Sequence, residues 1–139
     1  AHVLTVCQGY AGKDVVRNKT YTAAECAYLT KTQLQKHGAA VLRCTRVPLT
    51  QYQYDAFTLF TYNVGSSAFC QSSLLKKLNQ GDYTGACNGL LAWDMAGGKH
   101  LAGLARRRVY EQQICLGKLA TGAPLSAATA AATGGMGAK

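Results

Sequence analysis

Acidic residues are scarce in this chain. Six Asp and Glu stand against 15 Lys and Arg, which gives a formal net charge of +9. A charge of this size predicts an anionic partner, such as nucleic acid, lipid headgroups or a bacterial cell wall. The basic residues are scattered, with Arg106–Arg108 as the densest cluster, and aromatic residues do not alternate with them. Nucleic-acid binding is therefore not expected.

Long apolar segments are also lacking. No run reaches the roughly 18 residues of a membrane span. Residues 1–12 have neither the basic start nor the long apolar stretch of a signal peptide, so action outside a cytoplasm would need a removed leader or another carrier. With 139 residues, the chain is too short for a two-domain enzyme, a TIM barrel or a Rossmann fold.

The cysteines form no Cys-x-x-Cys pair, so the common zinc and thioredoxin spacings are absent. An even number of widely spread cysteines predicts three disulfides in an oxidising compartment. Six cysteines allow fifteen pairings, and the sequence alone does not choose among them. A catalytic cysteine is the alternative, but no nucleophile signature surrounds any of them. The six are Cys7, Cys26, Cys44, Cys70, Cys87 and Cys115.

The N-terminal third predicts one strand and one helix. Residues 2–10 are rich in β-formers and alternate weakly, which is typical of a short strand that leads into a turn. Thr22 and Glu25 have the spacing of a capping box, in which the two side chains satisfy the first backbone N–H groups of a helix. That helix is expected to run to about His37, where Gly38 can end it.

The rest of the chain reads as helices and a tail. Thr50 and Gln53 form a second capping box, and residues 63–65 are expected to end the helix that it opens. From residue 118 to residue 139 the sequence is rich in Ala and Gly, which predicts a flexible tail after a domain at 1–117. Further helices are expected at 74–79, capped by Ser72 or Ser73, at 83–95, capped by Asp82, and at 104–116.

Five segments become informative when they are taken together: Leu4–Gly12, Phe60–Gly65, Ser73–Asp82, Trp93–Lys99, and Gly103–Arg108 with Glu111. In order and spacing they resemble the phage-type lysozymes, glycoside hydrolase family 24. The similarity covers about residues 3–117 and is strongest to the cysteine-containing endolysins of phages that infect Gram-negative bacteria.

The resemblance implies an α+β fold that is mostly α, with a small N-terminal β element and a larger helical lobe. It implies a monomer that acts on peptidoglycan, between N-acetylmuramic acid and N-acetylglucosamine, with no metal or organic cofactor. The site of action would be the periplasm or cell wall of the host, or the extracellular space. The implied disulfides are Cys44–Cys70 and Cys87–Cys115, which leaves Cys7–Cys26.

The resemblance also implies roles for single residues. Thr5 matches the family's catalytic threonine, although an ordinary strand threonine is the alternative. Gln8 and Tyr10 stand where the family has Tyr and His on the N-terminal side of the glycan cleft. Asn63 and Gly65 either line this cleft or only form a helix C-terminus.

Three other positions match the family near its C-terminal helix. Trp93 either stacks on a sugar or packs in the core, and the core is favoured because Leu90, Leu91 and Met95 flank it. Arg107 matches a structural arginine that pairs with the family's N-terminal helix, and Glu111 matches a structural glutamate.

Cleavage of a glycosidic bond needs a carboxylic acid that protonates the leaving oxygen. The family pattern is Glu, eight residues, Asp or Cys, five residues, Thr, and counting back from Thr5 places both acidic positions before residue 1. Glu25 and Asp82 are predicted helix caps, so Asp14 or Asp94 is the candidate substitute acid.

We therefore expect the printed chain to be inactive or nearly so as a muramidase. The alternatives are a peptidoglycan-binding module without catalysis and a cationic protein that acts on bacterial membranes.

Overall fold

The computed structural model describes residues 22–123. The chain divides into two compact units, residues 1–36 and 37–139. The first helix, α1 (Ala23–Cys44), begins in the first unit and ends in the second. No helix in the described range combines the length and apolar character that a bilayer crossing requires.

The start of α1 confirms the first capping box. The backbone N–H of Thr22 donates to Glu25 Oε1 at 3.0 Å, and the backbone N–H of Glu25 donates to Thr22 Oγ1 at 3.1 Å. These reciprocal bonds satisfy donors that have no partner inside the helix.

The end of α1 corrects the sequence prediction, because the helix continues through Gly38 to Cys44. Gly38 is buried, and a Cβ at this position would overlap the hydroxyl of Tyr54. Glycine is used here for the close approach of two helices, and a helix can contain it at a cost of roughly 1 kcal/mol relative to Ala.

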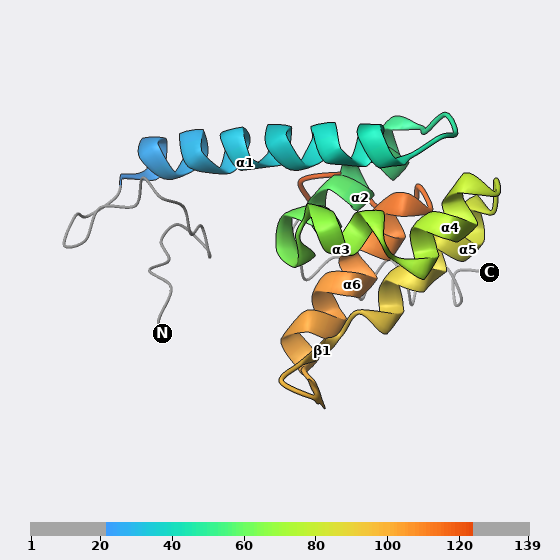
Figure 1. The fold of residues 1–139 in the computed structure, drawn as a ribbon. Coiled ribbons are helices and arrows are strands. Elements are labelled where there is room, and N and C mark those ends of the chain that lie inside the picture. Colours follow the sequence, from blue (N-terminus) through green and yellow to red (C-terminus); the bar gives the residue numbers. More distant parts are fainter. Residues whose placement is uncertain (1–21, 124–139) are drawn as a thin grey trace. The chain divides into compact units, whose positions relative to one another are not determined.

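Helices α2 (Gln51–Val64) and α6 (Ala102–Cys115) pack against each other in the second unit (Figure 1). Around them lie α3 (Ser66–Cys70), α4 (Ser73–Asn79), α5 (Tyr83–Gly89) and the 3₁₀ helix η1 (Leu90–Ala92). The largest fully buried apolar side chains of this core are Phe57, Phe60, Phe69, Leu74, Leu78, Leu90 and Ile114.

The predicted caps of this unit are confirmed. Thr50 and Gln53 make both bonds of the second capping box at the start of α2. Ser72 accepts from the backbone N–H of Leu75, and Asp82 begins α5 in the same way. Each short polar side chain replaces a missing intrahelical bond, so local sequence is sufficient to set where these helices begin.

The region after α5 differs from the predicted helix at 83–95. Helix α5 ends at Gly89, and after η1 the chain forms a two-stranded antiparallel hairpin of β1 (Met95–Ala96) and β2 (Lys99–His100), with Met95 opposite His100. Gly97 and Gly98 make the turn with φ of +59° and +80°. Two consecutive positive φ values are typical of a two-residue hairpin turn. A right-handed helix cannot contain them, so no helix continues through this region.

The fold is mostly α with a small β element, as predicted. The described sheet lies at residues 95–100. The strand that the sequence predicts at residues 2–10 lies outside the described residues.

Residues 118–123 are anchored to the helical core. The hydroxyl of Tyr110 donates to the carbonyl oxygen of Ala123 at 2.7 Å, and Thr121 Oγ1 donates to Asp55 Oδ2 at 2.7 Å. Leu119 packs against the buried cluster. These contacts extend the packed region to residue 123, and the domain boundary after residue 117 stays a prediction. Residues 124–139 of the predicted tail lie outside the described part.

Candidate functional site

Two predicted glycan-binding residues lie at the C-terminal end of α2. Asn63 is exposed, and Gly65 caps the helix with φ of +96°. Positive φ favours glycine, and a Cβ at Gly65 would meet no atom within 4 Å. The surface beside this end of α2 is therefore open. The other predicted site residues, Thr5, Gln8 and Tyr10, lie outside the described residues.

A buried arginine links Asn63 to α6. Arg108 is 1% exposed, and its Nη2 donates to Asn63 Oδ1 at 2.7 Å and to Glu111 Oε2 at 3.2 Å. Its Nε lies 3.1 Å from Glu111 Oε1, so the guanidinium faces both oxygens of the carboxyl group and makes one hydrogen bond to it. Arg108 therefore holds the end of α2 by one charge-assisted hydrogen bond, and Glu111 of the next turn of α6 faces the same guanidinium.

An aromatic ring, itself packed against Trp93, lies against the same arginine. The guanidinium carbon of Arg108 lies 5.1 Å from the ring centroid of Phe60. The ring of Trp93 meets Phe60 edge to face, with centroids 5.2 Å apart. Trp93 is partly buried against the core, as its flanking leucines predicted. The cation over the ring adds to the fixed position of Arg108.

The buried arginine of α6 is the neighbour of the one singled out in the sequence, whose pairing with a helix ahead of this chain's strand stays a prediction. Arg107, the predicted residue, is exposed, and the buried arginine is Arg108. The reason is helical periodicity: residues 108, 111 and 115 of α6 lie on one face at spacings of three and four, and all three are buried. The sequence alone does not show which of the three consecutive arginines is buried. The spacing of three residues to Glu111 is the signal that selects Arg108.

The electrostatics of the pair are dominated by burial. Burial raises the pKa of Glu111 from 4.5 to about 8, while Arg108 and then Arg107 act to lower it. Burial also lowers the pKa of Arg108, with Glu111 opposing that shift. Both shifts have the direction that desolvation imposes on a charged group.

Stability should fall as the pH rises from about 5 to about 8, because of Glu111. In this range the folded state keeps a proton on Glu111 that the unfolded chain releases, so deprotonation favours unfolding. One proton limits the slope to ~1.4 kcal/mol per pH unit, and the slope vanishes above the folded pKa. Urea unfolding at half-unit pH steps measures it.

The control for this prediction is Glu111→Gln. The two proteins share every other titratable group, so the difference between wild type and E111Q isolates Glu111. An equal pH slope in both proteins would contradict the assignment.

The described carboxylates all have structural partners. Glu25 and Asp82 cap helices, and Glu111 faces Arg108. Asp55 accepts from Gln51 and Thr121 in addition to its place in α2. Asp94, a candidate substitute acid, lies 2.8 Å from His100 Nδ1 beside the hairpin. The other candidate, Asp14, is not among the described residues. In residues 22–123 no group of His, Cys, Asp and Glu could hold a metal ion.

Two disulfides tie the second unit together. The pairs are Cys44–Cys70 and Cys87–Cys115, which are the two pairings that the family resemblance implied. Cys26 is also disulfide-bonded, and the Cys7–Cys26 prediction involves a residue outside the described range. Such cross-links fit an oxidising compartment.

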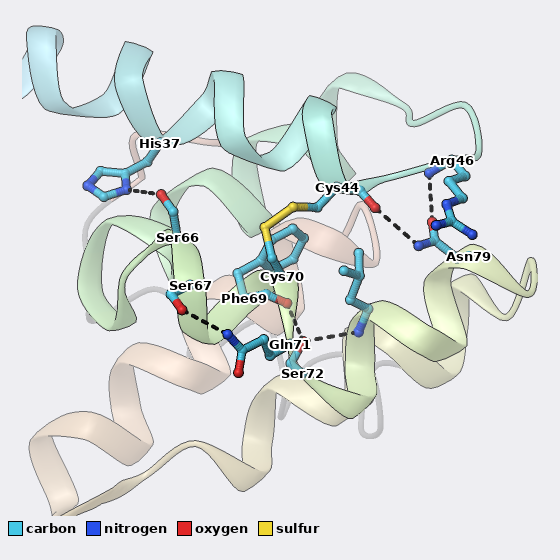
Figure 2. Close-up of a disulfide and its surroundings, with 11 residues drawn as sticks. His37, Cys44, Arg46, Ser66, Ser67, Phe69, Cys70, Gln71, Ser72 and Asn79 are labelled. Carbon is cyan, nitrogen blue, oxygen red and sulfur yellow. Dashed lines mark hydrogen bonds between the residues drawn. A yellow bond between two sulfur atoms is a disulfide. The ribbon is translucent and has the colours of Figure 1, made fainter.

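Figure 2 shows how the Cys44–Cys70 bond is flanked by polar contacts. On one side His37 Nδ1 lies 3.2 Å from Ser66 Oγ, just after the end of α2. On the other side Asn79 Oδ1 accepts a hydrogen bond from the backbone N–H of Arg46, and Asn79 Nδ2 donates to the carbonyl oxygen of Cys44. Residues 37–46 are thus fastened to α3 and α4 by one covalent and several hydrogen bonds.

Comparison with known proteins identifies the family of this chain. The family model described as phage lysozyme matches residues 1–111. The chain belongs to the phage lysozyme family. It is 44% identical to the SAR-endolysin of bacteriophage PS119 over 114 residues, which is 82% of this chain and 68% of the relative. It is 43% identical to the SAR-endolysin of enterobacteria phage P21 over 114 residues, which is 82% of this chain and 69% of that protein.

Solved structures agree with this phage lysozyme assignment. An endolysin from Escherichia coli O157:H7 phage FAHEc1 matches with a TM-score of 0.74 and 30% identity, covering 83% of this chain and 77% of that one. A mutant of P22 lysozyme matches with a TM-score of 0.70 and 38% identity, covering 81% and 79%. The family resemblance and the lysozyme-like fold predicted from the motifs are thereby confirmed.

Proposed function

We propose that this phage lysozyme hydrolyses peptidoglycan between N-acetylmuramic acid and N-acetylglucosamine. The family match over residues 1–111 carries the proposal. Its site of action would be the host periplasm or cell wall, or the extracellular space, where disulfides persist. The reaction uses side chains and water: a carboxylic acid protonates the leaving oxygen while water adds to the anomeric carbon.

The proposed reaction needs a residue that serves as the catalytic acid. The five described carboxylates already serve as caps, hydrogen-bond acceptors or ion-pair partners. Family spacing places the catalytic Glu ahead of Thr5, before residue 1. We infer that residues 22–123 supply the folded frame and the glycan contacts, and that none of their five carboxylates is the catalytic acid.

Release of reducing ends from purified Gram-negative peptidoglycan tests this proposal. We expect the 139-residue chain alone to release no more than background and to pellet with the wall. The same chain preceded by a helix with Glu at the family spacing should release reducing ends. A Glu→Gln version of that added helix is the matched control, because it changes only the proton donor.

Other outcomes separate the alternatives. Cleavage by the 139 residues alone would place the acid in this chain, and Asp14→Asn and Asp94→Asn would locate it. Wall binding without cleavage in every version would indicate a binding module. Leakage of anionic vesicles that added salt abolishes, with no wall binding, would indicate a membrane-active cationic protein.

A further inference from the structure

The orientation of the Asn63 side chain follows from its partner. A guanidinium has only N–H donors, so the atom of Asn63 that faces Arg108 must be the carbonyl oxygen Oδ1. This oxygen lies 2.7 Å from Arg108 Nη2. Since Oδ1 and Nδ2 diverge from the same planar carbon, the two N–H donors of Nδ2 point away from Arg108.

Arg108 is held firmly enough to impose this orientation. It is 1% exposed, it meets Glu111 at 3.1 and 3.2 Å, and it lies over the ring of Phe60. If the Asn63 amide turned over, its N–H groups would face guanidinium N–H groups at a partly buried contact. Leaving such donors unpaired costs about 1–3 kcal/mol.

The amide therefore offers a fixed donor at an open surface. Asn63 itself is exposed at the end of α2, and no atom lies within 4 Å of a Cβ built on Gly65. A fixed pair of donors recognises a carbonyl or hydroxyl oxygen. Among the groups of peptidoglycan sugars, the N-acetyl carbonyl is a strong acceptor of this kind.

We propose that Arg108 is a positioning residue that turns the Asn63 amide outward, so that Nδ2 donates to an acceptor oxygen of an N-acetylated sugar. The proposal rests on the proposed function for the ligand class. Asn63 would then offer only N–H donors to a ligand, so the site would bind ligand groups that accept hydrogen bonds and reject groups that donate them.

Asn63→Asp separates this role from a structural one. Aspartate is nearly isosteric and still accepts from Arg108, but its second oxygen has no proton to donate. We expect N63D to keep or raise its melting temperature and to bind the tetramer of N-acetylglucosamine about tenfold more weakly, equivalent to ~1.4 kcal/mol. Isothermal titration of the 139-residue chain measures this, so no cleavage is required.

The matched control is Gln53→Glu. It makes the same amide-to-carboxylate change on α2, ten residues earlier and thus about 15 Å away along the helix. Glutamate retains the acceptor that Gln53 supplies to its capping box. Its affinity for the tetramer should equal that of wild type.

A second variant tests Arg108 itself. Arg108→Met with Glu111→Leu replaces the buried pair by apolar side chains of similar size and leaves Asn63 intact. We expect the Asn63 side-chain ¹⁵N order parameter to fall, and affinity for the tetramer to drop about fivefold, or ~1 kcal/mol. In wild type, the Asn63 Nδ2 proton resonances should shift on addition of the tetramer.

Each result decides between the two proposals. Equal binding by N63D and wild type, or an unshifted Asn63 amide while other resonances move, overturns the donor role and leaves the lysozyme function intact. A well-ordered amide in the double variant overturns the role of Arg108. If wild type binds neither the tetramer nor peptidoglycan, the proposed function fails together with this inference.

Discussion

Replacing Arg108 with Met is expected to lower the free energy of unfolding by about 3–4 kcal/mol at pH 9, where Glu111 is ionised and loses its partner in a buried ion pair. Glu111 would remain 1% exposed without the guanidinium, and Asn63 Oδ1 would lose its donor. The pKa of Glu111 would rise further, since Arg108 is the larger of the two charges that lower it. Urea unfolding followed by circular dichroism measures the loss.

The double variant Arg108→Met/Glu111→Leu should recover most of this stability. Well-packed apolar side chains often replace a buried ion pair without loss, because no charge then has to be desolvated. Arg107→Met is the control on the same helix: Arg107 is exposed, so the change should stay within about 0.5 kcal/mol of wild type. If R108M also stayed within that range, the contacts of Arg108 with Asn63 and Glu111 would not hold α2 to α6 in solution.

Removal of the Cys87–Cys115 disulfide should cost about 3.5 kcal/mol, from the loop entropy of a cross-link across 28 residues of sequence. Both cysteines are buried in the core, so Cys87→Ala/Cys115→Ala adds a packing loss and avoids a buried hydroxyl. The comparison is Cys44→Ala/Cys70→Ala, which has a similar separation of 26 residues but involves cysteines that are only partly buried.

Unfolding under non-reducing conditions should therefore rank the two variants, with loss of the Cys87–Cys115 bond the more destabilising. Reduction of wild type should cost more than either pair of substitutions, because it opens every disulfide. A loss under 1 kcal/mol for Cys87→Ala/Cys115→Ala would mean that packing alone holds α5 to α6.

Much of this fold was predictable from local sequence. The capping residues Thr22, Thr50, Ser72 and Asp82 set the starts of four helices through contacts with residues three positions away. Such contacts depend only on neighbouring residues, so they can be recognised without a structure. The five motif segments likewise identified the family, because their order and spacing belong to the sequence.

Other features needed tertiary contacts. Gly38 looks like a helix end in the sequence, yet α1 continues because Tyr54 of α2 lies against it. Residues 118–123 look like the start of a tail, yet Asp55 and Tyr110 anchor them. In each case the residue that makes the deciding contact is distant in sequence, so local composition does not predict the contact.

The candidate site divides in the same way. The sequence by itself determined the family, the helix caps and the two residues at the end of α2. Only the tertiary structure decided that Arg108, and not Arg107, is buried against Glu111, and that Asn63 therefore shows its donors to solvent. The physical reason is that burial selects one face of α6, and a buried guanidinium then dictates the orientation of any amide that it meets.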